Sequence, residues 1–243
     1  EPSFLAGLER AATQDEDPSV AAVAACYAGY FQATFGQLGA AQAFFVRAQE
    51  LVAGGAVEPW AIAEVLFSQG QLLRAQDQRG DALAVLLRAA QVGDACGHVW
   101  AAGSARYITA KIHLDRRQGA PALTAVAQAL PSTLDLGIHT STLALLHVAA
   151  GAGAALDRHV EAATLLGAVD AWGDRIGYHP ARMDPVDGER HRALVREALT
   201  ADELAEATAR GRTLPPAEAV ARVIALAASL PAPAPAGAPV ARG

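Results

Sequence analysis

The stretch that decides the fold is GQLLRAQDQRGDALAVLLRAA, residues 70–90, in which one helical pattern ends in a short polar turn and an Ala-rich one begins at Gly80-Asp81-Ala82. Similar turns recur at Gly39-Ala40-Ala41 and Val160-Glu161-Ala162, and a poorer copy lies at Gly119-Ala120-Pro121. The copies fall on a ladder with a period of about 40 residues, which is typical of stacked helical hairpins. We therefore expect an all-α array of the kind that usually binds a partner and rarely carries out chemistry.

Small side chains recur at fixed offsets along this ladder, as the close packing of two helices in a hairpin requires. The pattern small, small, large, small resembles a tetratricopeptide (TPR) repeat, and it is clear in two units, fair in the fourth and poor in the third. An Ala-rich helical protein could match it by chance, and its fold would still be all-α. The predicted fold is a TPR-like α-α superhelix, a right-handed solenoid of antiparallel hairpins, with a short C-terminal helical cap. In the second unit the pattern consists of Gly70, Ala82, Leu86 and Ala89.

The chain is predicted to have three parts. Residues 1–177 form the TPR-like repeats, residues 178–230 form a helical module that continues the solenoid, and residues 231–243 form a Pro/Ala-rich flexible linker or tail. Because residues 3–13 already have an amphipathic helical pattern, we expect the chain to begin inside a larger protein. The hairpins are expected near residues 19–53, 59–95, 99–130 and 140–176.

Local signals refine these boundaries. Pro131-Ser132 is interpreted as a separator between hairpins, so that the helix after Pro121 is short and covers residues 122–130. Residues 178–188 are expected to form a loop that is followed by three shorter helices. Thr200 and Glu203 have the spacing of a capping box at the start of the second of these helices.

Composition and charge exclude several classes of protein. Hydrophobic residues make up 52% of the 243 residues and aromatic residues 5%, so the core should consist mainly of Ala, Leu and Val. No apolar run reaches the ~20 residues of a membrane span, and we expect a soluble, cytoplasmic chain without a membrane partner. The net charge is −6 and Lys111 is the only lysine, which argues against direct nucleic-acid binding by this segment. Cys26 and Cys96 lack metal-ligand spacing and are interpreted as small core residues in a reducing compartment.

The most specific resemblance lies in residues 161–225. The order of its motifs is similar to the end of the helical-repeat region in large actinobacterial transcription regulators with an ATPase of the STAND class, including LuxR-family and AfsR-like proteins. This resemblance implies a sensor or interaction arm whose ATPase and DNA-binding parts lie elsewhere in the polypeptide. The residues that carry it include Ala162–Ala168, Trp172, Ile176-Gly177, Pro185, Glu189-Arg190, Leu199-Thr200, Ala209–Arg212 and Glu218–Val220.

A binding groove is expected along the first helix of each hairpin. Polar and aromatic side chains among Ala and Leu suit a peptide, because Arg binds carboxylates and Phe or Tyr anchors apolar groups. The alternative for each candidate taken singly is that it lies on a solvated helix face and binds nothing. Trp60, Trp100 and Trp172 are interpreted as packing residues between layers. The candidate groove residues are Tyr30, Glu64, Phe67, Gln71, Arg74, Arg106, His113 and His147.

The expected partner is a protein or peptide, the upstream ATPase module of the same polypeptide, or a small-molecule effector; a homodimer is also possible. The alternative function is a stand-alone TPR-like scaffold that binds peptides or self-associates, and a helical small-molecule enzyme is a remote third.

No catalytic or metal-binding motif supports the enzyme interpretation. The chain has no Gly-x-x-x-x-Gly-Lys-Ser/Thr run for nucleotide phosphates, and no cofactor is expected. The polar residues between His179 and His191, which include Asp184, lack the spacing that places two metal ligands on one helix face. Asp187 and Glu189 have a simpler role at a helix N-terminus, where carboxylates favour the helix dipole.

Overall fold

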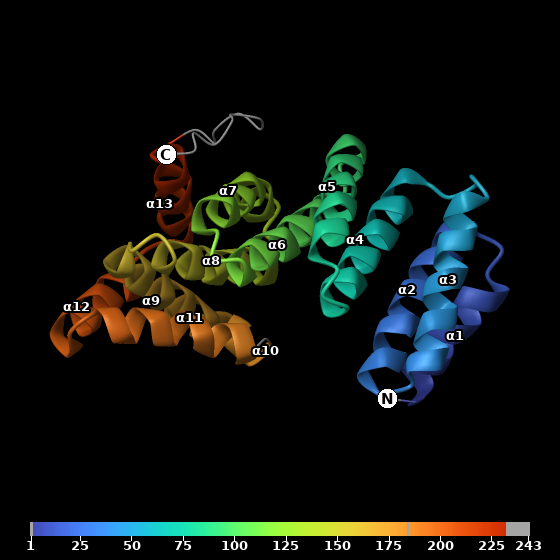
Figure 1. Cartoon of the computed structure of the whole chain (residues 1–243), viewed down its shortest axis with the longest axis horizontal. Coiled ribbons are helices and arrows are strands. Elements are labelled where there is room, and N and C mark those ends of the chain that lie inside the picture. The colour runs from blue at the N-terminus through green and yellow to red at the C-terminus, as the bar shows by residue number, and fades with distance from the viewer. Residues whose placement is uncertain (1, 184, 232–243) are drawn as a thin grey trace, which may run out of the picture.

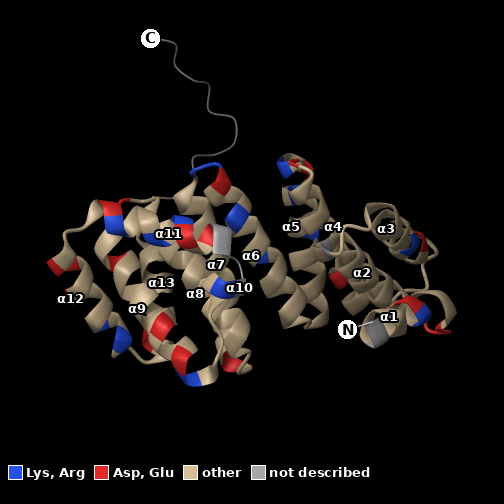
Figure 2. Cartoon of the chain, turned by 90° about the horizontal axis from the view of Figure 1, so that it is seen from below, with Lys and Arg blue, Asp and Glu red and all other residues tan. Residues whose placement is uncertain are grey.

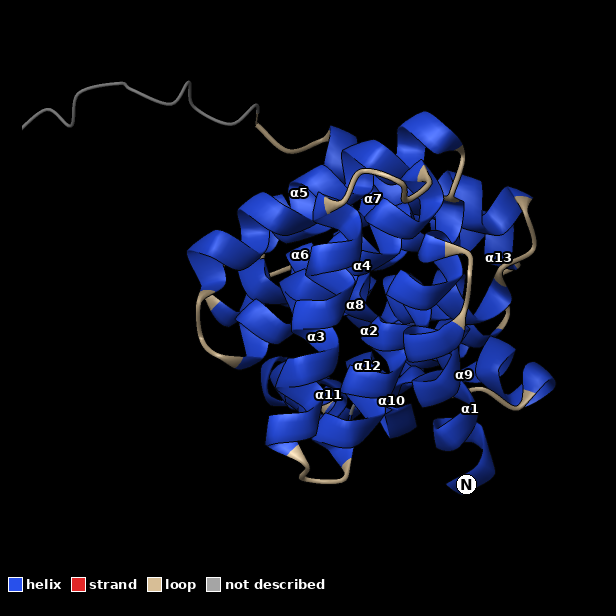
Figure 3. Cartoon of the chain, turned by 90° about the vertical axis from the view of Figure 1, so that its right-hand side faces the viewer, coloured by secondary structure: helices blue, strands red, loops and turns tan. Residues whose placement is uncertain are grey.

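The computed structural model describes residues 2–183 and 185–231. This part of the chain is all-α, as predicted: it folds into thirteen helices and has no strand (Figure 3). The C-terminal segment expected to be a linker lies outside the described residues apart from Pro231, and so does Asp184. The helices are α1 (Pro2–Gln14), α2 (Pro18–Thr34), α3 (Leu38–Ala53), α4 (Pro59–Ala75), α5 (Arg79–Cys96), α6 (Val99–Asp115), α7 (Gly119–Asp135), α8 (His139–Ala154), α9 (His159–Ile176), α10 (Pro180–Met183), α11 (Pro185–Ala198), α12 (Ala201–Arg212) and α13 (Pro216–Ala228).

Helices α2 to α9 form four hairpins whose starts repeat along the chain, at intervals of about 40 residues as stacked hairpins do. The hairpins line up in an elongated array, with α1 and α2 at one end and α12 at the other (Figure 1). The first helices of the hairpins start at Pro18, Pro59, Val99 and His139, and the second helices at Leu38, Arg79, Gly119 and His159.

The turns inside the four hairpins share one backbone geometry. In each turn one residue adopts the left-handed conformation, with φ between 57° and 78°. The next residue donates its backbone N–H to the carbonyl oxygen five positions earlier, at 2.8–2.9 Å, which closes the C-terminus of the first helix. The four hairpins thus share one kind of helix-closing turn. The left-handed residues are Gly36, Asp77, Arg117 and Asp157.

Two boundaries differ from the prediction. Helix α7 continues through Pro131 to Asp135, because Leu130 and Thr133 on either side are fully buried and their packing outweighs the lost backbone hydrogen bond. Pro121 does not shorten this helix, since it lies in the first turn, where backbone N–H groups have no helical partner in any case. Residues 178–188 are largely helical rather than a loop, because they contain α10 and the start of α11.

The core is a stripe of three successive clusters, as expected for stacked hairpins. One cluster lies among α1 to α4, the second among α4 to α6, and the largest extends from α6 to α13. Ala is the most frequent buried residue of each cluster, with fully buried Leu such as Leu143 and Leu146 in the largest. Cys26 is buried in the first cluster, whereas Cys96 is exposed at the end of α5, so its assignment to the core was wrong.

The C-terminal helices pack on the last two hairpins from several sides. Helix α12 packs on α9, α13 packs mainly on α7, and α10 and α11 pack on α8. The predicted capping box opens α12: the Glu203 backbone N–H donates to Thr200 Oγ1 at 3.3 Å, and the Thr200 backbone N–H donates to the Glu203 carboxylate at 2.9 Å.

Candidate functional site

The first helices of the four hairpins form a continuous inner layer. Helix α2 packs on α4, α4 on α6, and α6 on α8, whereas the second helices of successive hairpins do not pack on one another to a comparable extent. Side chains of this layer that face away from the second helices lie along one side of the array.

A cavity of about 410 Å³ near α13 lies apart from this layer. A larger one, of about 530 Å³, lies on it, between α2 with α3 and α4 with α6. Its walls are mostly aromatic and aliphatic. The rings of Phe67 and Trp100 meet edge to face with centroids 5.5 Å apart, a favourable arrangement for aromatic pairs. The polar groups on its walls are neutral and come from Tyr27, Tyr30, Ser68 and Gln71.

A second cavity of about 310 Å³ continues from the first, because Phe67, Gln71 and Trp100 line both. It extends over α6 and α8 past Ser104, Tyr107, Thr140 and Ser141 to Tyr178. We call the two cavities together the inner groove. The described residues that line the groove carry no charge, and the groove crosses all four inner helices.

Four of the eight predicted groove residues lie at cavities on the inner layer. Tyr30, Phe67 and Gln71 line the inner groove. Arg74 borders a smaller cavity of about 210 Å³ beside it, where Gln71 also contributes.

The other four predicted residues do not line these cavities. Arg106 turns toward α5 and forms an ion pair with Asp94, with Nη1 3.0 Å from Oδ1. His113 contacts Gln118 at the turn after α6. His147 is buried beneath α11, with 4% of its surface exposed.

Glu64, the fourth, is buried beside the groove rather than facing it. Its carboxylate lies 2.7 Å from His98 Nε2, and Tyr27 donates a hydrogen bond to it at 3.4 Å. Burial raises the pKa of Glu64, and the bonds from His98 and Tyr27 only partly offset that effect. Glu64 thus links α2, α4 and the start of α6, and its role is structural.

The predicted groove residues include none of those that α6 and α8 contribute to the inner groove. Trp100 lines the groove and is not only a packing residue, and Trp60 is partly exposed, whereas Trp172 is buried as predicted. The repeat itself could have identified one of these residues. Tyr107 lies about one repeat of 40 residues after Phe67, so it occupies the position in its hairpin that Phe67 occupies in the preceding one.

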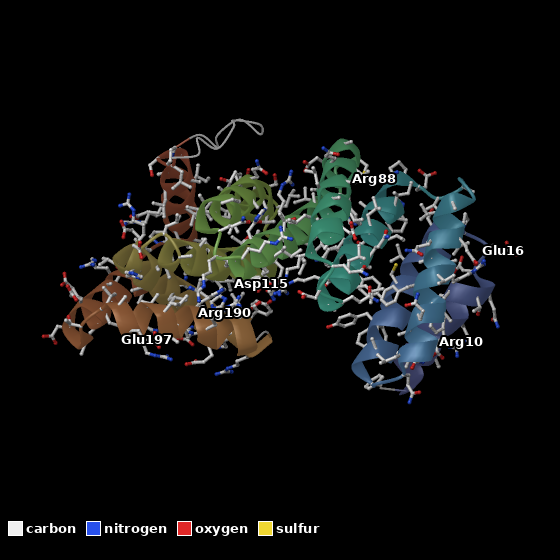
Figure 4. All side chains as sticks on the ribbon, viewed as in Figure 1. Arg10, Glu16, Arg88, Asp115, Arg190 and Glu197 are labelled. Atoms are coloured by element: carbon white, nitrogen blue, oxygen red, sulfur yellow. The ribbon has the colours of Figure 1, made fainter. Side chains whose placement is uncertain are left out.

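A cluster of charged side chains lies at the end of the groove, where α11 meets the inner layer. Lys111 Nζ lies 2.8 Å from Asp187 Oδ2, and Arg190 Nη2 lies 2.8 Å from Asp187 Oδ1. Arg74 bridges Asp115 at 3.1 Å and Asp187 at 3.4 Å, and Arg190 also approaches Asp115 at 3.3 Å. Charged residues gather around α6 and α11 in Figure 2, and Asp115 and Arg190 lie close together in Figure 4. We call these five residues the ion cluster.

Burial and the opposite charges of its members explain the pKa shifts of the ion cluster. Burial alone would raise the pKa of Asp187, but the hydrogen bond and charge of Lys111, together with Arg190 and Arg74, hold it below its usual value. Burial lowers the pKa of Lys111, and the nearby Arg74 adds to that effect while Asp187 opposes it. The carboxylate of Asp187 is therefore firmly ionised.

Next to the ion cluster, two histidines meet in the protein interior. The rings of His147 on α8 and His191 on α11 have centroids 5.5 Å apart, and both residues are at most 4% exposed. Within the described residues, His147 Nε2 and both ring nitrogens of His191 have no hydrogen-bond partner. Burial is the main cause that lowers the pKa of His147 to about 3, and the neighbouring His191 adds to it. Burial likewise lowers the pKa of His191 to about 4, and Arg190 adds to that effect. Both rings are therefore neutral at physiological pH.

In the described residues, no group of three or more His, Cys, Asp or Glu is placed to hold a metal ion. No helix in this part of the chain combines the length and apolarity needed to span a bilayer. Comparison of the chain with family descriptions, curated proteins and solved structures found no significant match.

Proposed function

We propose that this chain is a non-catalytic binding module whose inner groove holds an extended, uncharged segment of a partner protein. The observation that carries the proposal is the continuity of the inner groove across α2, α4, α6 and α8. Phe67 and Trp100 would anchor apolar or aromatic side chains of the partner. Gln71, Ser104 and Tyr107 offer hydroxyl and amide groups to its backbone, which an extended peptide must satisfy when it is buried.

Within this proposal the array is a TPR-like superhelix that acts as the sensor or interaction arm of a larger ATPase-containing transcription regulator in the cytoplasm. Its support is the repeat of about 40 residues in the helix starts and the resemblance of residues 161–225 to such regulators. The arm would pass the binding event to an ATPase module, and neither nucleotide nor DNA would bind to this segment.

Trp100 offers a direct test, because it lines the groove while Trp172 is buried elsewhere. The full chain carrying Trp60→Phe is titrated with a library of uncharged peptides that contain one or two aromatic residues. We expect at least one peptide to change Trp100 emission in a saturable way. If no peptide does so and a small apolar molecule does, the groove is an effector site and the peptide proposal is wrong.

A matched pair of variants then locates the binding. Gln71→Arg places a charge in the uncharged groove and should weaken peptide binding at least tenfold. Gln91→Arg makes the same change at an exposed position of α5 and should leave the affinity unchanged. Equal peptide affinity of the two variants would exclude the inner groove as the binding site.

A further inference from the structure

The aromatic side chains of this chain gather on the inner groove. Aromatic residues make up only 5% of the sequence, yet all four of its tyrosines line the groove, together with Phe45, Phe67 and Trp100. The core clusters consist mainly of Ala and aliphatic residues, so the array uses its rings chiefly along this surface. The four tyrosines are Tyr27, Tyr30, Tyr107 and Tyr178.

Three of these rings follow the repeat of the array. Tyr27 on α2, Phe67 on α4 and Tyr107 on α6 follow one another at intervals of 40 residues, and all three line the groove. Each lies eight or nine residues after the start of its helix, so the rings occupy equivalent heights in successive inner helices. Helices that pack on one another have axes about 8–10 Å apart. A segment that crosses the inner helices therefore meets a ring about every 9 Å.

This spacing distinguishes between the conformations that a bound segment could adopt. A β-strand returns a side chain to the same face after two residues, about 6.6 Å, and an α-helix does so after one turn, about 5.4 Å. A polyproline II helix does so after three residues, about 9.3 Å. Of the three conformations, the polyproline II helix matches the spacing of the rings best.

The polar groups of the groove also suit this conformation. Within the described residues, the side chains of Gln71, Trp100 and Tyr107 make no hydrogen bond, and they bring an amide, an indole N–H and a phenol O–H to the walls. Burial raises the pKa of Tyr107 to about 12, so its hydroxyl stays protonated and can donate. A polyproline II helix has no internal hydrogen bonds, and proline has a carbonyl oxygen but no N–H. A proline-rich segment thus offers mainly acceptors to these donors.

We propose that the segment held in the inner groove is proline-rich and binds as a polyproline II helix, with an apolar side chain at every third position. This inference rests on the proposed function, because it names the chemistry of the segment that the groove holds. The apolar side chains would lie against Tyr27, Phe67 and Tyr107 in turn. Because proline restricts the free segment to the bound conformation, less conformational entropy is lost on binding than for a flexible segment.

Two synthetic peptides of equal length test the conformation. One consists of four repeats of Leu-Pro-Pro, which favours the polyproline II helix, and the other of four repeats of Leu-Ser-Ser, which has the same apolar spacing on a flexible backbone. Each is titrated into the full chain by calorimetry. We expect the Leu-Pro-Pro peptide to bind saturably and at least tenfold more tightly than the Leu-Ser-Ser peptide. Equal affinities, or tighter binding of the Leu-Ser-Ser peptide, would overturn the inference.

A matched pair of variants then tests the series of rings. Phe67→Leu keeps an apolar side chain but removes the ring, and should weaken binding of the Leu-Pro-Pro peptide at least fivefold. Phe35→Leu makes the same change at an exposed position after α2, away from the groove, and should leave the affinity unchanged. Equal affinity of the two variants would contradict binding along the rings. The comparison of the two peptides uses the unsubstituted chain, so it does not depend on whether the variants fold.

The outcomes separate this inference from the proposed function. If uncharged peptides without proline bind and are weakened by Gln71→Arg, while the Leu-Pro-Pro peptide does not bind, only the inference is wrong. If no peptide of either kind binds, the proposed function is wrong and the inference is wrong with it.

Discussion

Acidification from pH 7 to pH 5 is expected to release α11 from the inner layer. The cause is the buried pair of His147 and His191, whose pKa values of about 3 and about 4 lie well below the 6.5 of an exposed histidine. At a pH between these lowered pKa values and 6.5, the two histidines bind more protons when α11 is released than when it is docked. The stability of docking is therefore complete above pH 6.5, falls as the pH drops below that value, and levels off near pH 3.

The size of the effect follows from the shifts. At pH 5 each histidine removes about 2 kcal/mol from the docked state, so the pair removes about 4 kcal/mol in total. The charged groups around the pair are Lys111 and Asp115 of α6 and Asp187, Arg190 and Arg192 of α11. Because the pKa of Asp187 is held below 3.8, its carboxylate stays ionised across this range.

Hydrogen exchange followed by mass spectrometry is the assay. After correction for the intrinsic pH dependence of amide exchange, protection of α11 should fall by a factor of about 10³ between pH 7 and pH 5, or until it is lost. Peptides from α5 serve as the internal reference. His147→Phe should remove about half of the effect, because one of the two titrating rings is lost. Constant protection of α11 from pH 7 to pH 5 would refute the reasoning.

Three further predictions concern the stability of the array, each measured as the free energy of unfolding in guanidinium chloride. Leu146→Ala should lower it by about 2–5 kcal/mol, because Leu146 is fully buried in the largest core cluster; a loss below 1 kcal/mol would mean that this cluster is loosely packed. Arg117→Gly should raise it by about 0.5–1 kcal/mol, because Arg117 has a φ of 57° and glycine adopts that conformation without strain, whereas the same change at exposed Arg88 within α5 should lower it. Thr200→Ala should lower it by about 1 kcal/mol through loss of the capping box of α12, and Thr200→Ser should restore most of that loss; equal stability of the two variants would argue against the cap.

Much of the fold could be predicted from the sequence because its repeat is local. The repeated turns that the sequence shows at Gly39, Gly80, Gly119 and Val160 fall at or next to the starts of the second helices. A turn leaves such a mark because polar and small residues interrupt the apolar helical pattern there. Pro131 was misread for the opposite reason: whether a helix continues through proline depends on the packing on either side, and that packing comes from distant parts of the chain.

The site was harder to predict, because a groove depends on the rotation of each helix about its axis. Small errors in the assumed repeat rotated the predicted face of α6 away from Tyr107 to Arg106. His147 was assigned to the open groove because nothing in its own repeat shows that α11 will cover it. Contacts such as that between Arg74 and Asp187 join residues far apart in the sequence, which a repeat pattern does not reveal.

The junction between the first two hairpins has a mechanical consequence. Residues 54–58 connect α3 to α4 and include Gly54-Gly55, and α3 barely touches α4, whereas α5 packs extensively on α6 and α7 on α8. The larger cavity of the inner groove lies across this thin junction, with Tyr30 and Phe45 on one wall and Phe67 and Trp100 on the other. Because α3 contributes little here, the two walls of this cavity are held together by the first core cluster, which α4 shares with α1, α2 and α3.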